Sequence, residues 1–324
     1  MLTVEVVSLK KYYKVHQKTP GLVGSLKSLI RRKFIDVPAV DDISFRIEEG
    51  ELVGFIGPNG AGKTTTLKCL SGLLYPTSGS VKVLGFRPEQ REDAFLKDIA
   101  LVMGQKNQLW WDLPPMESFI LNKEIYDLSE GEFRRTINDL TQLLGLGNLV
   151  NVPVRKLSLG ERMKCELIAA LLHNPKVLFL DEPTIGLDVV MQKAIRDFIA
   201  EYNKRHKATI ILTSHYMEDV RQLCRRVIII DRGKLLFDGQ LSEIVKKYAP
   251  TKLLSVTFDK EPDFNKLNKI GKISKFSFPQ AQIAVERGKT SEMAAQLLRQ
   301  FAVEDLTIEE PDIEDIIRKV FSGE

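Results

Sequence analysis

A glycine-rich run has the residue types and spacing of a phosphate-binding loop. It reads Gly57-Pro58-Asn59-Gly60-Ala61-Gly62-Lys63-Thr64-Thr65 and fits the pattern G-x-x-x-x-G-K-[ST], after an apolar run at 52–56 and before a helical pattern at 65–70. In this setting the glycines let backbone amides face a phosphate, Lys63 reaches the β- and γ-phosphates, and the Thr64 hydroxyl can bind Mg²⁺. A glycine-rich turn without a ligand is the alternative, which the placement of Lys63 and Thr64 disfavours. We therefore predict a nucleotide site at this run, the P-loop.

Two carboxylates stand at the end of another apolar run. Asp181 and Glu182 follow residues 177–180, and ligands bind at the carboxyl ends of strands in open α/β sheets. Beside a P-loop, Asp181 would hold Mg²⁺. Glu182 is directed differently and could accept a proton from an attacking water. A pair of solvated acids at a strand end is the alternative, which the presence of a P-loop disfavours.

A third motif lies between these two and reads Leu157-Ser158-Leu159-Gly160-Glu161. Ser158 and Glu161 have the spacing of a capping box, which explains both residues without any ligand. In its position between P-loop and acidic strand, however, the motif resembles the signature Leu-Ser-Gly-Gly-Gln of the ATP-binding subunits of ABC transporters. Ser158 and Gly160 match that signature, whereas Leu159 and Glu161 replace a glycine and a glutamine.

The resemblance covers about residues 4–240 and implies roles for three more residues. Gln105 matches the glutamine that reaches Mg²⁺ and the attacking water. Asp188, in Gly186-Leu187-Asp188, matches the loop that crosses to the other subunit, and His215, in Thr213-Ser214-His215, matches the histidine that senses the γ-phosphate. A lone glutamine or histidine is usually a surface or core residue, so the ordered set of motifs carries these assignments.

An aromatic residue near the N-terminus is the candidate for stacking on adenine. Tyr13 falls where the family places that residue, and a base stacked on an aromatic face contributes roughly 1–3 kcal/mol. Tyr12 is the neighbouring candidate. An aromatic residue that closes the first strand is the alternative explanation for Tyr13.

Strand-length apolar runs alternate with helical patterns, which predicts an α/β fold with a mostly covered sheet. Helical patterns alone at about 115–175 predict a helical subdomain inserted in an ATP-binding domain of residues 1–240. A second set of elements predicts a small α+β domain at 241–324. The strands expected in the first domain are at 4–7, 52–56, 99–103, 177–180, 209–212 and 227–230.

A basic insertion is expected at about 14–37. Pro20 can begin a helix there, with one apolar face made of Leu22, Leu26, Leu29 and Ile30. A solvated surface element and a site facing anionic lipid or a membrane partner are equally compatible with this pattern. Both tryptophans of the chain are adjacent, at Trp110-Trp111, and since one core can hardly bury both, at least one is expected to contact a partner.

The composition is that of an ordinary folded chain. Of its 324 residues 44% are hydrophobic and 28% charged, and the formal net charge is +4, which gives no reason to expect a nucleic-acid partner. No apolar run approaches the roughly 20 residues of a membrane span. The cysteines Cys69, Cys165 and Cys224 lie in apolar helical patterns that favour buried thiols. We expect a cytoplasmic protein.

The resemblance implies an ATPase that uses ATP and Mg²⁺. Two ATP molecules would bind between two copies, or between this chain and a related ATPase, and a separate integral membrane permease would carry out transport. The subunit would then be peripheral on the inner face of the cell membrane. The P-loop sequence, the basic insertion and the C-terminal domain resemble the subgroup that serves ABC-2 type exporters. The alternatives are a soluble ABC ATPase that acts on nucleic acid or ribosomes, which the single cassette without heptads disfavours, and a binding-only module, which Lys63 and Glu182 oppose.

Overall fold

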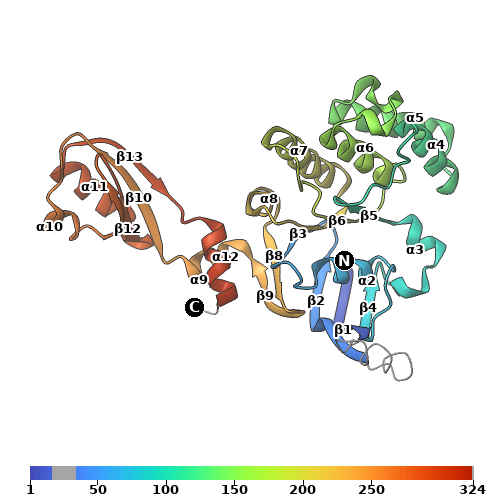
Figure 1. Ribbon diagram of the computed structural model, residues 1–324, viewed down its shortest axis with the longest axis horizontal. Coiled ribbons are helices and arrows are strands. Elements are labelled where there is room, and N and C mark those ends of the chain that lie inside the picture. The colour runs from blue at the N-terminus through green and yellow to red at the C-terminus, as the bar shows by residue number, and fades with distance from the viewer. Residues whose placement is uncertain (17–33, 323–324) are drawn as a thin grey trace, which may run out of the picture. The chain divides into compact units, whose positions relative to one another are not determined.

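A six-stranded sheet is the centre of the first of two units into which the chain divides, Met1–Gly239 and Gln240–Glu324 (Figure 1). The computed structural model describes residues 1–16 and 34–322. The sheet has the order β5-β6-β7-β3-β8-β9, and the pairs β5–β6, β6–β7, β7–β3 and β3–β8 are parallel. Its strands are β3 (Leu52–Ile56), β5 (Ile99–Met103), β6 (Val177–Asp181), β7 (Thr209–Thr213), β8 (Arg226–Asp231) and β9 (Lys234–Gln240).

The parallel strands read as continuous apolar runs because both of their faces are covered. Every residue of β6 and of β7 is buried. The helices α2 (Lys63–Leu70), α3 (Asp93–Lys97), α7 (Val189–His206) and α8 (Met217–Leu223) follow strands of the two sheets in the chain. The predicted α/β fold is confirmed, and all three cysteines are free and buried as expected.

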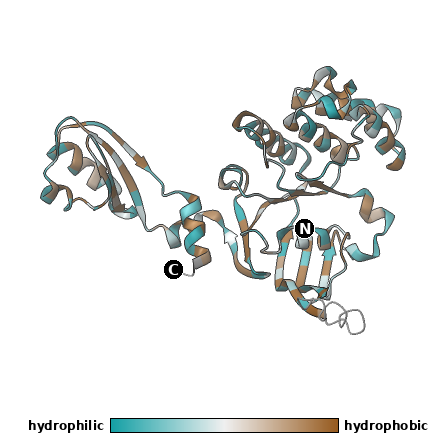
Figure 2. Ribbon diagram, viewed as in Figure 1, coloured by the Kyte–Doolittle hydropathy of each residue, from teal (hydrophilic) through white to brown (hydrophobic). Residues whose placement is uncertain are grey.

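A second, antiparallel sheet of the first unit has the order β2-β1-β4. Its strands β1 (Leu2–His16), β2 (Phe34–Glu48) and β4 (Ser78–Val83) alternate between hydrophobic and polar residues (Figure 2). Alternation of this kind is expected where one face packs on a core and the other meets water. The inner face contributes Val4, Ile43 and Val81 to a core that also holds Leu67 of α2.

The prediction for the N-terminal region was wrong in two respects. The strand expected at 4–7 extends to His16, and residues 34–37 of the expected insertion belong to β2, which pairs with β1 from Leu2↔Glu48 to His16↔Phe34. The sequence pattern conceals β2 because it contains Pro38 and several acidic residues, which an edge strand tolerates. The short strands β4 and β9, whose polar residues also hide them, were not predicted. The apolar helix face from Leu22 to Ile30 lies outside the described residues.

Three helices form the predicted helical subdomain (Figure 1). They are α4 (Pro115–Ile125), α5 (Glu130–Leu144) and α6 (Leu159–Leu171). The capping box of Ser129 and Glu132 begins α5, and Gly145 in the left-handed conformation ends it. None of the helices that the structure describes combines the length and hydropathy of a membrane span.

The second unit has the strand and helix order β-α-β-β-α-β, preceded and followed by one helix each. Its sheet has the order β11-β12-β10-β13. One face packs against α10 and α11 in a separate core that includes Leu254, Ile283 and Leu297. The four-residue helix α10 was not predicted, because it is too short to show a period. The elements are α9 (Leu241–Tyr248), β10 (Thr251–Phe258), α10 (Phe264–Leu267), β11 (Lys272–Ser277), β12 (Gln280–Glu286), α11 (Thr290–Gln300), β13 (Val303–Glu309) and α12 (Ile313–Ser322).

Two adjacent leucines of α11 test this second core. Leu297 is completely buried, whereas Leu298 is 54% exposed. Leu297→Ala should lower the free energy of unfolding of the second unit by about 2–5 kcal/mol, because lost burial and a residual cavity both destabilise. Leu298→Ala should change it by less than about 0.5 kcal/mol. Differential scanning calorimetry compares the two variants, and an equal loss in both would contradict the placement of Leu297 in the core.

Candidate functional site

The P-loop connects β3 to α2, as its sequence predicts. Lys63, the first residue of α2, is buried, and its ammonium group donates hydrogen bonds to the carbonyl oxygens of Gly57 at 2.6 Å and Pro58 at 3.1 Å. Burial lowers the pKa of Lys63, an effect that the nearby carboxylates of Glu182 and Asp181 oppose. The positive charge therefore lies against the loop, next to backbone amides that suit phosphate oxygens.

Asp181 joins the P-loop helix to two strand ends. Its Oδ2 accepts a hydrogen bond from the Thr64 hydroxyl at 2.8 Å, and its Oδ1 accepts one from the Thr213 hydroxyl at 2.7 Å. Asp181 ends β6 and Thr213 ends the neighbouring strand β7. Carboxylate and hydroxyl oxygens that converge in this way are the ligand types that Mg²⁺ prefers.

Glu182 lies between two side chains that the sequence separates widely. The Gln105 side chain donates a hydrogen bond to Glu182 Oε2 at 2.9 Å, and His215 Nε2 lies 2.6 Å from Glu182 Oε1. The three residues come from the loops after β6, β5 and β7. Glu182 is buried and has a left-handed φ of 56°, a conformation that costs a non-glycine residue on the order of 1–3 kcal/mol and is concentrated at functional sites. The arrangement fits a carboxylate held in one orientation to accept a proton.

Gly104 allows the loop after β5, which carries Gln105, to lie close to the loop after β6, which carries Glu182. Its amide donates a hydrogen bond to the Asp181 carbonyl at 2.8 Å. A Cβ atom at this position would lie 2.1 Å from the Glu182 carbonyl oxygen. Any other residue would therefore push Gln105 away from Glu182.

The signature residues form a separate cluster with Asp188. Ser158 caps α6 and exchanges its hydrogen bonds with Glu161, as the capping-box pattern predicts. Gly160 packs against Met191 of α7, where a Cβ would lie 2.5 Å from the Met191 side chain. Asp188 caps α7 by accepting the amides of Val190 and Met191. Among the described residues no hydrogen bond joins Ser158 or Asp188 to the P-loop of the same chain.

The two tyrosine candidates differ in their surroundings. The Tyr12 hydroxyl donates a hydrogen bond to Asp41 Oδ1 at 2.5 Å, which raises the pKa of Tyr12. Tyr13, the next residue of β1, points to the opposite face of the strand. Tyr13 is 39% exposed, and Lys11 Nζ lies 5.4 Å from the centroid of its ring. Tyr13 is thus the more exposed of the two tyrosines and stays the candidate for stacking on a base.

Sequence reasoning missed Asp219, which connects the two loops beneath the site. This completely buried residue of α8 accepts hydrogen bonds from the hydroxyls of Thr184 at 2.5 Å and Ser214 at 2.6 Å. The buried guanidinium group of Arg196 on α7 donates to its other oxygen at 2.8 Å. Thr184 lies two residues after Glu182, and Ser214 directly precedes His215. An acid four residues after a motif histidine was the available signal, but it does not reveal burial.

Comparison with known proteins gives these motifs a common context. Residues 40–185 match the family model described as ABC transporter, and residues 250–309 match the one described as EvrA-like ABC transporter, C-terminal domain. The chain is 36% identical over 217 residues to the ABC transporter ATP-binding protein NatA of Bacillus subtilis (strain 168), which covers 66% of this chain and 88% of NatA.

Relatives with different names and a solved structure align as well. The linearmycin resistance ATP-binding protein LnrL of the same strain is 31% identical over 228 residues, 70% of this chain and 73% of LnrL. The methionine import ATP-binding protein MetN of Geobacillus kaustophilus (strain HTA426) is 32% identical over 244 residues, 74% of this chain and 67% of MetN. The solved structure of an ATP binding subunit of an ABC transporter superposes with a TM-score of 0.63 at 26% identity, covering 76% of this chain and 93% of that chain.

Substitutions of two adjacent acids of α8 test the buried contact between Asp219 and Arg196. Asp219→Ala should lower the free energy of unfolding by about 3–5 kcal/mol, because it leaves the buried charge of Arg196 without its partner. Glu218 pairs with Arg221 at the surface, so Glu218→Ala should cost less than about 1 kcal/mol. Urea denaturation measures both changes. Equal midpoints for Asp219→Ala and the wild type would exclude a structural role for the buried pair.

Proposed function

Because this chain belongs to the ABC transporter family, in which it is an ATP-hydrolysing subunit of a membrane transporter, we propose that it hydrolyses ATP at the carboxyl ends of β5, β6 and β7. The observation that carries this proposal is the position of Glu182. Its carboxylate is held between Gln105 and His215, one residue after an aspartate that contacts the P-loop threonine.

Each side chain of the site has a role that its contacts support. The backbone amides that follow Pro58 in the P-loop and the ammonium group of Lys63 bind the phosphates, and Tyr13 stacks on adenine. Glu182 accepts the proton of the attacking water, while Gln105 and His215 orient its carboxylate. His215 can exchange this contact for the γ-phosphate, which makes it a sensor of bound ATP.

The oxygen atoms at the P-loop fit Mg²⁺. Thr64 Oγ1 and Asp181 Oδ2 lie 2.8 Å apart, and the side-chain oxygen of Gln105 would be a further ligand from the neighbouring loop. When bound, Mg²⁺ would neutralise charge on the β- and γ-phosphate oxygens. Lys63 and the loop amides supply the rest of that stabilisation.

The separation of Ser158 and Asp188 from the P-loop supports a site completed by a second subunit. Ser158 and Leu159, at the N-terminus of α6, are exposed, so the positive end of the helix dipole is accessible to a phosphate. A second copy of the chain, or a related ATPase, would place Ser158, Gly160 and Asp188 against the ATP of the first. ATP then holds the two subunits together until hydrolysis releases them.

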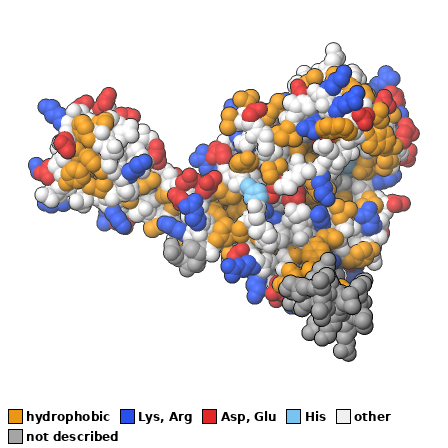
Figure 3. Space-filling model, viewed as in Figure 1, with side chains coloured by type: hydrophobic (Ala, Val, Ile, Leu, Met, Phe, Trp, Pro, Cys, Tyr) orange, Lys and Arg blue, Asp and Glu red, His pale blue; other side chains and the backbone are white. Residues whose placement is uncertain are grey.

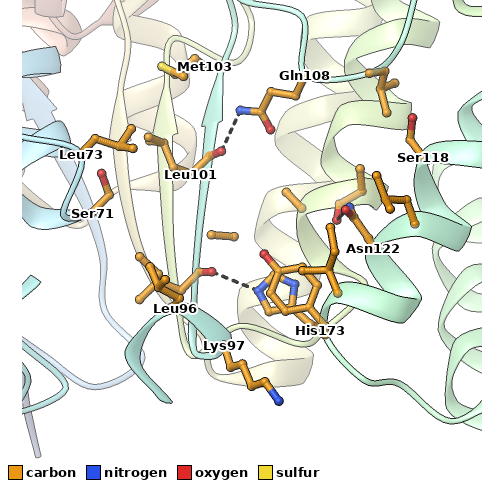
Figure 4. A pocket seen from close by; sticks show the side chains of 18 of the residues that line it. Ser71, Leu73, Leu96, Lys97, Leu101, Met103, Gln108, Ser118, Asn122 and His173 are labelled. Carbon is orange, nitrogen blue, oxygen red and sulfur yellow. Dashed lines mark hydrogen bonds between the residues drawn. The ribbon is translucent and has the colours of Figure 1, made fainter. Parts of the chain in front are cut away.

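We propose that the membrane permease binds at a cavity beside α4. This cavity of about 760 Å³ is lined by residues of β5, α4 and α6, among them Leu101, Ser118 and Asn122 (Figure 4). Trp110, which is half-exposed, also lines it. Leu121 and Ile125 of α4 also line it and are exposed, and hydrophobic side chains reach the surface over this helical region in Figure 3. Exposed apolar surface next to the loop that carries Gln105 suits a helix of the permease.

We propose that the chain serves an ABC-2 type transporter and that the direction of transport is export. The likeness of the P-loop sequence to that of ABC-2 exporter subunits and the similarity to LnrL, a resistance protein by name, support it. The similarity to MetN, an import protein by name, makes import the competing assignment. The subunit would work at the inner face of the membrane, where the basic residues between β1 and β2 would contact anionic lipid.

The first functional prediction concerns the proposed base. Glu182→Gln should lower ATP turnover by about 10²–10⁴-fold with unchanged ATP affinity, because only the proton acceptor is lost. It should also accumulate as an ATP-bound dimer, whereas Lys63→Ala should lose ATP binding itself. Phosphate release, nucleotide binding and light scattering after size exclusion measure these effects. Turnover within a few-fold of wild type would rule out Glu182 as the base.

The same variant tests the composite site. In the Glu182→Gln background, Ser158→Arg should abolish the dimer while each chain still binds ATP, because the signature residue faces the partner's nucleotide. A dimer that survives Ser158→Arg would contradict this geometry.

The second functional prediction concerns the partner. The tagged chain, purified from its native membranes in mild detergent, should bring with it one integral membrane protein. Leu121→Glu should reduce that recovery at least about tenfold, since it buries a charge in the apolar contact. Leu298→Glu, an exposed leucine of the second unit, should leave the recovery unchanged. Recovery of RNA or ribosomes in place of a membrane protein would support the alternative function.

A further inference from the structure

A buried carboxylate of helix α6 holds the loop that follows Gln105. Glu166 is only 4% exposed. Its Oε1 accepts the backbone amides of Gln108 at 2.7 Å and Leu109 at 3.2 Å, while its Oε2 is buried and has no hydrogen-bond partner. Burial raises the pKa of Glu166, and the two amides partly oppose that effect. A carboxylate is costly to bury, so a leucine would be the simpler residue if only packing were needed.

Other contacts hold the same loop, residues 104–113, between β5 and α6. The Gln108 side chain donates a hydrogen bond to the Leu101 carbonyl of β5 at 2.9 Å (Figure 4). The Arg162 guanidinium group of α6 lies 5.1 Å from the Trp111 ring centroid, a cation–π contact. The loop is therefore attached to α6 through Glu166 and Arg162, one helical turn apart.

The two ends of loop 104–113 face different surroundings. At one end Gln105 contacts Glu182. At the other, Trp110 and Trp111 are 51% and 47% exposed. The amides that Glu166 accepts lie between these ends. Ser158, at the start of α6, is eight residues from Glu166, or about 12 Å along the helix at 1.5 Å per residue.

We propose that Glu166 is a positioning residue that couples α6 to loop 104–113, so that a nucleotide held at the α6 N-terminus changes the position of both Gln105 and the tryptophan pair. The inference rests on the proposed function, in that it takes Gln105 to serve hydrolysis and Ser158 to face a partner's nucleotide. The hydrogen bonds from the Gln108 and Leu109 amides to one buried carboxyl oxygen of Glu166 are the link between the loop and α6.

The tryptophans make the proposal directly measurable. The chain has only two, Trp110 and Trp111, so its tryptophan emission reports on this loop alone. Addition of the non-hydrolysable analogue AMP-PNP with Mg²⁺ should change the emission and its quenching by acrylamide in the wild type. Glu166→Leu, which has no acceptor, should lose most of that change. Glu166→Gln, which keeps an acceptor oxygen, should retain more than half of it.

Steady-state kinetics provide the second readout. Glu166→Leu should lower kcat for ATP by roughly ten- to a hundredfold, the scale of an ångström-sized misplacement, with little change in KM because the P-loop is untouched. Glu117→Leu, which removes an exposed acid of α4 near the same loop, should alter neither the emission change nor kcat. Thermal unfolding identifies variants that fail to fold, in which case Glu166→Gln alone is compared with the wild type.

The outcomes separate this proposal from the proposed function. An emission change of wild-type size in folded Glu166→Leu, or no nucleotide response in the wild type, would overturn the coupling by Glu166. An intermediate response in Glu166→Gln with a matching intermediate kcat would support it. Loss of the emission change with unaltered kcat would support the coupling of α6 to the loop and remove Gln105 from the hydrolysis mechanism. Because AMP-PNP is not hydrolysed, the emission test does not depend on Glu182 being the base.

Discussion

Buried carboxylates at the carboxyl edge of the parallel sheet need hydrogen-bond donors, and this need determines how the loops of the first unit are arranged. A buried carboxylate without partners is costly enough that it would be protonated or the site would rearrange. Each one here instead receives donors from a different segment of the chain. Asp181 accepts hydrogen bonds from Thr64 and Thr213, and Glu182 contacts Gln105 and His215. Asp219 accepts from Thr184, Ser214 and Arg196. Glu166 accepts from the amides of Gln108 and Leu109.

These carboxylates differ in what can replace their partners. The contacts of Glu182 with Gln105 and His215 border the nucleotide site that we propose, in which water and phosphate would take their place when ATP binds. Asp219 is completely buried beneath the same loops, and water cannot reach it to compensate for a lost partner. The contacts of Glu182 are therefore exchangeable, whereas the contacts of Asp219 that support the same loops are permanent. A catalytic carboxylate needs both, because it must respond to the nucleotide and still keep its orientation.

Local patterns allowed much of the fold to be predicted. The capping boxes at Ser129 and Ser158 are formed as expected, because a cap depends on residues three positions apart. The apolar run at 177–180 forms a fully buried strand. Strand β2, in contrast, was missed, because Pro38 and the acids Asp41 and Asp42 interrupt its alternation, and its pairing with β1 is seen only in the fold.

The sequence by itself determined the P-loop, the acidic strand end and the order of the motifs, and from these the kind of chemistry. Those features are local: a strand, a turn and a helix bring Gly57 and Lys63 together without help from the rest of the chain. Only the tertiary structure decided that the Tyr12 hydroxyl binds Asp41, that Asp219 supports the loops of Glu182 and His215, and that Glu166 is buried against loop 104–113. The physical reason is that a polar group can be buried only where another segment supplies its hydrogen-bond partner. That segment is often distant in the sequence, so the spacing of residues along the chain does not identify it.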